Sequence, residues 1–249
     1  MIDTNVVQPK PVQSQARTTQ SQSGLRQFLR IVGAVAAKDL RSEARGRRML
    51  AVWSTFGLLL FIVFYITISM SHIAFQTVAP SVLWIIFALI GTMGLGRGVS
   101  QEHELGGWQG LMISPISHSA IYFGKLIANT IVTLTAEVGV LIGFSLIYHW
   151  PVDTIGMLLV LFLGTLGMMG VGTFVSAYVA NKGGKELMLP VMVLPVVIPV
   201  IALAGQLTSV VLAQPLTSNW LIVIVFLIGY DLITILGGAA GFAWISELY

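Results

Sequence analysis

Two carboxylic acids stand inside stretches of this chain that are otherwise long and uncharged, Glu137 and Asp231. An ionisable side chain at membrane depth is costly and usually faces a bundle interior or a water-filled cavity. Both acids are therefore candidates for lining a translocation path or for holding a subunit interface. For Asp231 the alternative is pairing with Tyr230, with Thr234 or with the backbone. An intramembrane enzyme that uses both acids is a rival interpretation, although no nucleophile–base pair or metal motif accompanies them.

Other kinds of site are excluded by composition and spacing. The chain has no cysteine, so disulfides and thiolate metal sites are ruled out. The sequences Gly183-Gly184-Lys185 and Gly124-Lys125 are followed by Glu186 and Leu126, so neither completes a P-loop. Any use of ATP must therefore go through a partner. No basic groove with interleaved aromatics supports nucleic-acid binding.

The elements that position these residues are membrane spans. Of the 249 residues, 56% are hydrophobic and 9% charged, whereas soluble domains carry roughly 25% charged residues. A helix needs roughly 20 apolar residues to cross a bilayer. This pattern predicts an all-α membrane protein with six transmembrane helices. The spans are expected at about 49–70, 80–97, 120–148, 154–180, 187–212 and 219–245.

The N-terminal region divides into two parts. Residues 1–24 are rich in Gln, Ser, Thr and Pro without an apolar block, which predicts a disordered cytoplasmic tail. In 25–48, apolar residues from Leu25 to Leu40 recur at helical spacing beside a basic face that ends in a run at 45–48. This pattern predicts an amphipathic helix in the membrane interface, near anionic lipid. A helix packed on a protein partner is the alternative.

The basic residues indicate the orientation. Nine of the thirteen Lys and Arg precede the first span, Arg97 and Lys125 bracket the second connection, and Lys182 and Lys185 lie in the fourth. The first, third and fifth connections contain none. Because basic residues concentrate in cytoplasmic loops, both termini and the segment 98–119 are expected in the cytoplasm.

The segment 98–119 is too polar to span and too apolar to extend freely into water. Trp108, Leu111 and Met112 form a short apolar stripe, and we expect Glu102 and Glu104 near the N-terminus of the same short helix, where negative charge is favoured. Gly106 and Gly107 permit a bend or a close approach, and Pro115 ends the helix. The physics predicts a docking helix at the membrane surface; a plain interfacial loop is the alternative.

The same segment resembles a motif of ABC-2-type exporter permeases, in which this region contacts the ATPase subunit. The matching residues, which the resemblance makes candidates for ATPase coupling together with Gly107 and Trp108, are Glu102, Glu104, Gly106, Leu111, Pro115 and Lys125. Gln109 departs from the motif, which usually has Glu there, and this puts in doubt any role that needs charge at that position.

Further stretches resemble the CcmB family, the membrane subunit of a haem exporter of cytochrome c maturation. They are KDLRSEARGRRML (38–50), LGTLGMMGVGT (163–173) and ELMLPVMVLPVVIPV (186–200). The resemblance implies a non-catalytic subunit of the bacterial inner membrane, with both termini cytoplasmic, and a homodimer. It also implies an ATPase partner (CcmA-like), a haem-handling membrane protein (CcmC-like), a small membrane protein (CcmD-like) and a periplasmic haem chaperone (CcmE-like). No bound cofactor is expected; haem is the candidate substrate. The same architecture with a glycan or drug substrate is the alternative.

Prolines and histidines are further candidates for functional roles. Pro190, Pro195 and Pro199 lie in the fifth span, where they could kink a moving gate or serve packing alone. His72 and His149, expected at the outer face, are candidate haem ligands because imidazole is a common axial ligand. No two of the four histidines lie at a ligand spacing, however, and His103 and His118 are expected at the cytoplasmic surface.

Overall fold

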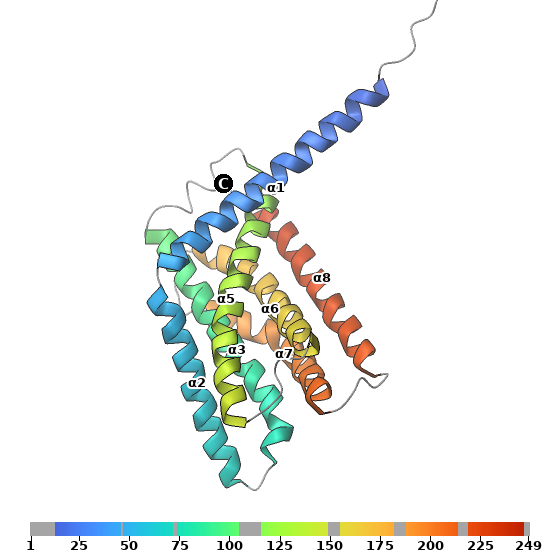
Figure 1. Cartoon of the computed structure of the whole chain (residues 1–249). Coiled ribbons are helices and arrows are strands. Elements are labelled where there is room, and N and C mark those ends of the chain that lie inside the picture. The colour runs from blue at the N-terminus through green and yellow to red at the C-terminus, as the bar shows by residue number, and fades with distance from the viewer. Residues whose placement is uncertain are drawn as a thin grey trace, which may run out of the picture.

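The computed structural model of the protein is an α-helical bundle (Figure 1). It describes residues 13–45, 47–71, 74–104, 116–148, 155–181, 188–213 and 219–246. These residues form seven helices and no strand. The helices are α1 (Gln13–Arg45), α2 (Arg47–Met70), α3 (Phe75–Glu104), α5 (His118–Tyr148), α6 (Ile155–Asn181), α7 (Met188–Ala213) and α8 (Asn219–Ser246).

The predicted all-α fold with six membrane spans is confirmed. All helices except α1 are long and apolar enough to cross a membrane, so the protein is a multi-pass membrane protein. The largest difference from expectation within these spans is in α3, which begins at Phe75 rather than near residue 80 and continues to Glu104. Pro80 removes a single backbone hydrogen bond near the start of this helix. Neither Gly nor Pro stands between Val99 and Glu104 to end it.

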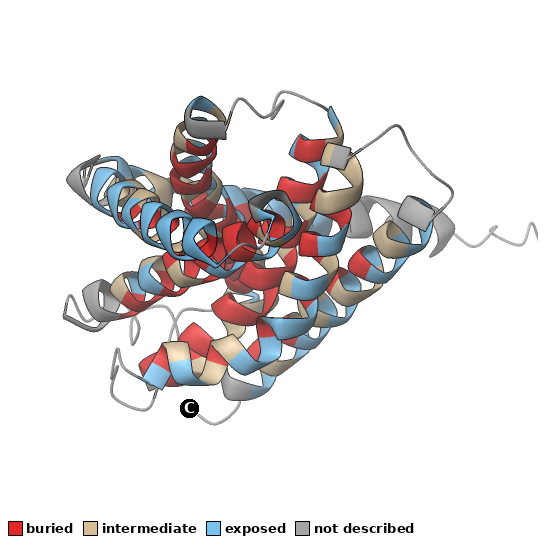
Figure 2. Ribbon diagram, turned by 90° about the horizontal axis from the view of Figure 1, so that it is seen from below, coloured by how far each residue is buried: buried red, intermediate tan, exposed pale blue. Residues whose placement is uncertain are grey.

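The spans differ in how far the protein itself buries them. In α3 and α6 about two thirds of the apolar span is buried, whereas α2 and α8 expose most of theirs. Helix α6 packs against α3, α5, α7 and α8, and α2 packs against α3 and α5. Figure 2, which views the bundle from one end, shows the buried residues turned inward and the exposed ones outward. The exposed apolar faces are those expected to meet lipid.

Glycines on α6 let two large side chains of α3 approach its backbone. A Cβ added at Gly164 would overlap the indole ring of Trp84, and one at Gly172 would overlap Leu95. Trp84 is fully buried, and its Nε1 donates to the Thr208 hydroxyl of α7 at 2.9 Å. Small residues commonly allow such close packing between membrane helices. The indole of Trp84 thus bridges α6 and α7.

Helix α1 is longer than the sequence predicts. Helical structure begins at Gln13, so the second half of the tail expected at 1–24 is helical, and residues 1–12 lie outside the described residues. The last proline of the tail is Pro11, after which extending a helix costs less than nucleating one. In Figure 1 the N-terminal half of α1 projects beyond the bundle.

The apolar stripe of α1 is shared between the bundle and the exterior. Val32, Val35 and Ala36 are buried, whereas Leu25 and Leu29 are exposed. The buried residues pack on α5, where a Cβ added at Gly124 would lie 2.7 Å from the Val35 Cβ and 2.9 Å from the Val32 carbonyl oxygen. Part of the stripe is therefore covered by the protein's own span rather than by lipid.

Candidate functional site

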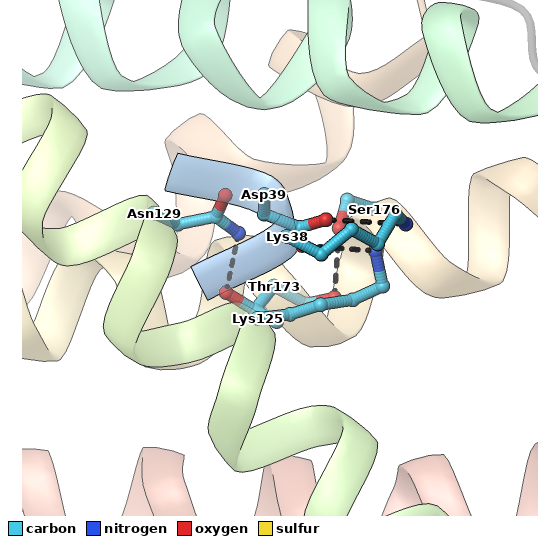
Figure 3. Close-up of polar contacts among 6 residues, drawn as sticks. All are labelled: Lys38, Asp39, Lys125, Asn129, Thr173 and Ser176. Atoms are coloured by element: carbon cyan, nitrogen blue, oxygen red, sulfur yellow. Dashed lines mark hydrogen bonds and ion pairs between the residues drawn. The ribbon is translucent and has the colours of Figure 1, made fainter. Parts of the chain in front are cut away.

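The junction between α1 and the spans is held by acidic residues of α1. One carboxylate oxygen of Asp39, Oδ2, lies 3.6 Å from Lys125 Nζ of α5, and the other lies 3.2 Å from Lys38 Nζ (Figure 3). Glu43 Oε1 lies 3.5 Å from Arg97 Nη1 of α3. Both ion pairs are largely shielded by the protein, so they are screened less than surface pairs. They fix α1 across the ends of two spans.

Polar side chains continue below this junction, between α5 and α6. The Asn129 side-chain amide donates to the Thr173 hydroxyl at 3.0 Å, and the Ser176 hydroxyl donates to the Thr173 carbonyl oxygen at 2.8 Å (Figure 3). A partly open cavity of about 100 Å³ lies beside these contacts. Its walls come from α1, α2, α3 and α5 and include Asp39, Glu43, Trp53, Asn129 and Thr133.

Lys125 is the member of the expected coupling set whose surroundings the structure describes. Its side chain is buried, with 8% of the residue exposed. It contacts α1 through Asp39, while the adjacent Gly124 receives the α1 backbone. Lys125 therefore links α5 directly to α1. Its role in ATPase coupling stays a prediction.

The remaining coupling residues are placed only in part. We expected Glu102 and Glu104 to begin a separate short helix, but both belong to the last turns of α3. Gly106, Gly107, Trp108, Leu111 and Pro115 lie outside the described residues, and so does Gln109. The connection from α3 to α5 leaves and re-enters the bundle at the end that carries α1, because Arg97 and Lys125 both pair with α1.

Glu137 lies deep in the bundle. It is fully buried, and the Thr165 hydroxyl of α6 donates to its Oε2 at 2.6 Å. The second carboxylate oxygen, Oε1, has no hydrogen-bond partner among the described residues. A buried polar atom without a partner forfeits free energy that a hydrogen bond would recover. Glu137 is therefore expected to lower the stability of the fold, which makes it a candidate for a functional role.

Asp231 is the second buried acid, and its environment differs. Its carboxyl lies against Gly167 of α6, where a side chain would collide with it, and only 3% of the residue is exposed. Neither carboxylate oxygen has a hydrogen-bond partner among the described residues. Tyr230 instead donates to the Val196 carbonyl oxygen of α7 at 2.7 Å, and Thr234 donates to the Asp231 main-chain oxygen at 3.1 Å. The pairing considered for Asp231 is thus not formed.

The two acids are not brought to one site. Glu137 approaches α6 at Thr165 and Asp231 approaches it at Gly167. Residues two positions apart in a helix are separated by about 200° around its axis. The two carboxyls therefore meet different faces of α6. A shared catalytic pair, which the intramembrane-enzyme interpretation requires, has no support in this arrangement.

The prolines of the fifth span lie within one continuous helix. Pro190 is in the first turn of α7, while Pro195 and Pro199 are inside it and face outward. Each interior proline removes a backbone hydrogen bond. Tyr230 of α8 binds the carbonyl of Val196 in the turn before Pro199. Whether α7 moves as a gate stays a prediction.

The histidines are only partly placed by the structure. His72 and His149 lie outside the described residues, so their candidacy as haem ligands stays untested. His103 belongs to α3, and His118 begins α5 half-buried. Among the described residues, no three His, Asp or Glu side chains are grouped to hold a metal ion.

Sequence reasoning missed the contribution of Asp39, Asn129 and Thr173. A signal was available, because polar residues recur at every fourth position of the third span, at 125, 129, 133 and 137. Such spacing places side chains on one face of a helix. Asp39, by contrast, stands among basic residues of a surface-like helix, where only the packing of α1 on α5 selects its partner.

One comparison with known proteins bears on this arrangement. The model of the CcmB protein family matches residues 30–246, which run from the middle of α1 to the last residue of α8. The matched region therefore includes the ion pairs at the α1 junction and both buried acids. A comparison with proteins of curated function found no match to the chain.

Proposed function

The chain belongs to the CcmB family, and on that premise we propose that it converts ATP hydrolysis by a separate ATPase into haem delivery. The family makes it the membrane component of a haem-exporting ABC transporter that serves cytochrome c maturation. The family match, over more than 200 residues and six apolar helices, is the observation that carries the proposal.

The ATPase docks at the end of the bundle that carries α1. The segment 98–119, whose motif resembles that of ABC-2 permeases, includes the last turns of α3, the connection to α5 and the first residues of α5 at this end. The ion pairs of Asp39 and Glu43 join α1 to the same two spans. A force on either the segment or α1 is thereby passed to α3 and α5 together. The basic residues gathered here favour a cytoplasmic location for this end and for both termini.

Of two possible outputs, we favour release of the loaded haem chaperone over movement of haem through this subunit. No two histidines of the sequence stand at a ligand spacing. The partners are those that the family resemblance implies, which are CcmA-like, CcmC-like, CcmD-like and CcmE-like proteins together with a second copy of the chain. Haem is a substrate of the complex, and ATP is bound by the ATPase partner.

Deletion of the chain tests the assignment. We expect loss of haem-stained c-type cytochromes, restored by the wild-type chain. Intact c-type cytochromes after deletion would favour the same architecture serving another substrate. A Soret band of the purified complex, recorded with each partner added in turn, then shows which component holds haem. Chaperone release predicts that the band follows the chaperone when ATP is supplied.

Substitutions in the segment 98–119 test whether the ATPase docks there. Glu104→Lys and Gly106→Val should reduce co-purification of the ATPase or uncouple its hydrolysis. Gly96→Ala, which adds a methyl group in open space, is the control. Normal ATPase association and hydrolysis in both test variants would contradict docking at this segment.

A further inference from the structure

Four polar residues form a column along one face of α5. Lys125, Asn129, Thr133 and Glu137 are spaced four residues apart, so their side chains lie above one another. Lys125, Thr133 and Glu137 are buried, and Asn129 is partly buried. The column runs from the ion pair with Asp39 into the fully buried interior of the bundle.

Helix α6 presents a matching set of groups. Asn129 donates to Thr173 at 3.0 Å, Thr133 donates to Met169 Sδ at 3.5 Å, and Thr165 donates to Glu137 at 2.6 Å. The α6 positions 165, 169 and 173 are also four apart. The two helices therefore meet in three successive polar contacts. Residues four apart in a helix are separated by about 6 Å along its axis.

Space for water reaches down this column from the α1 end. The cavity of about 100 Å³ is lined by Asn129 and Thr133, and a second one of about 30 Å³ is lined by Lys125, Asn129 and Ser176. Both volumes exceed the roughly 10–15 Å³ that one water molecule requires. From Thr133 to Glu137 a single helical turn remains. One water with two hydrogen bonds of about 2.8 Å spans that distance.

The column is closed at its other end. Beyond Glu137 the buried residues of α5 are Val140, Leu141 and Phe144. The Phe144 ring packs edge-to-face on Phe61 of α2, with ring centroids 4.7 Å apart. These groups offer no hydrogen bonds to a relay. Glu137 is thus open to polar groups on one side and sealed by apolar ones on the other.

The helices packed on α5 bring hydroxyl, carboxyl and basic groups near the column. From α2, the Ser54 hydroxyl binds the Ala136 carbonyl oxygen, and within α5 the Tyr122 hydroxyl binds the Gly170 carbonyl oxygen. Asp231 of α8 meets the other face of α6. The charged groups at the mouth are Lys38, Asp39, Glu43, Arg97 and Lys125. Glu137 is the acid at the inner end.

We propose that this column is a hydrated proton path that begins at the α1 end and terminates at Glu137. A proton from bulk water moves through water and the hydroxyl of Thr133 to Glu137 Oε1, and it leaves by the same route. Each hop forms one O–H bond and breaks the next, so the waters and the Thr133 hydroxyl each give up one proton for the one they accept, and the only net change is the O–H bond gained at Glu137. Proton uptake at Glu137 goes beyond haem delivery. The path does not depend on the proposed function, and only the assignment of its α1 end to the cytoplasm rests on that function.

Hydrogen–deuterium exchange of the Glu137 carboxylic acid tests the path. Full-length protein in lipid nanodiscs, with Asp231→Asn to remove the other buried acid, is transferred to D₂O. The carboxyl C=O band is then followed by infrared spectroscopy, at the pH where this band is largest. Glu137→Gln identifies the band by removing it. If that variant does not fold, Glu137→Asp identifies it by shifting its frequency.

Thr133→Val and Asn129→Leu replace polar groups of the column by apolar groups of similar size. We expect each to slow exchange at Glu137 about tenfold, as loss of a hydrogen-bonding relay group would. Thr135→Val is the matched control, because Thr135 faces outward on α5 and its hydroxyl binds the Ile131 carbonyl oxygen. It should leave the rate unchanged.

Two outcomes would overturn the proposal. Exchange at the wild-type rate in both column variants would show that the polar contacts serve only to align α5 with α6. The absence of a Glu137-dependent carboxyl band at every pH where the protein stays folded would show that Glu137 takes up no proton. Because neither measurement involves haem or the ATPase, these results are independent of the proposed transport function.

Discussion

Lys125 of α5 is buried beneath α1 and lies 3.6 Å from Asp39. Gly124 and Lys125, which are adjacent in the sequence, make two different contacts with α1. Gly124 admits the backbone of α1, and Lys125 binds its carboxylate. The pair holds α1 against α5, so a helix that the sequence predicts to lie in the membrane interface packs on the bundle.

The Asp39–Lys125 ion pair should contribute measurably to the position of α1. We expect Asp39→Asn and Lys125→Met each to lower stability by about 1–3 kcal/mol, because each leaves a shielded charge with fewer partners. The double variant should cost less than the sum of the two. Thermal unfolding of the four proteins in one detergent provides the cycle. Additive effects would contradict a direct interaction; Arg41→Gln, on the exposed side of α1, is the control.

The close approach of α1 to α5 predicts a size limit at Gly124. Gly124→Val should destabilise the protein by about 1–3 kcal/mol, because its side chain would overlap Val35 and the Val32 carbonyl. Gly229→Val adds the same side chain where no atom lies within 4 Å. The chain has no native cysteine, so a pair of spin labels on α1 and α5 can report the displacement. Unchanged label distances in Gly124→Val would contradict the contact.

Asp231 is predicted to lower stability in the native protein. Its carboxylate oxygens have no partner among the described residues, so an apolar side chain of similar size should cost nothing or raise the unfolding temperature. We expect Asp231→Leu to be as stable as the wild type or more so, by up to about 3 kcal/mol. Gly167→Ala, which adds a methyl group against the same carboxyl, should be destabilising. A marked loss of stability in Asp231→Leu would show that the carboxyl has a partner.

Hydropathy was sufficient to predict the six spans because each is a run of apolar residues of bilayer length, from Leu50–Met70 through Leu221–Trp244. It gave the ends of α3 less well. The apolar span stops at Val99, but the helix continues to Glu104, because backbone hydrogen bonds continue as long as no residue interrupts them. The end of an apolar run therefore does not mark the end of a helix.

The candidate site was less predictable for a related reason. Composition identifies Glu137 and Asp231 as buried acids, but it cannot show which face of α6 each one meets. Which face each acid meets depends on Thr165 and Gly167, and neither residue differs in type from others in the same span. The sequence also does not predict the partner of Lys125, because Asp39 lies on a helix that hydropathy assigns to the membrane surface. Contacts between distant segments come from packing, which periodicity does not encode.

The interior prolines of α7 allow gating to be separated from packing. Pro199→Ala restores a backbone N–H inside the helix and should stabilise it, since proline in a helix interior costs about 3 kcal/mol in other proteins. A static α7 predicts a higher unfolding temperature with unchanged maturation of c-type cytochromes. A moving α7 predicts the higher temperature together with a loss of maturation, because a stiffer helix opposes the motion. Tyr230→Phe, which removes the hydroxyl bound to Val196, tests the same turn from α8. If the contact secures α7 in a resting position, this variant should lower stability by about 1 kcal/mol and leave maturation intact or faster. An unfolding temperature of Pro199→Ala at or below that of the wild type would show that the prolines fit the native curvature of α7.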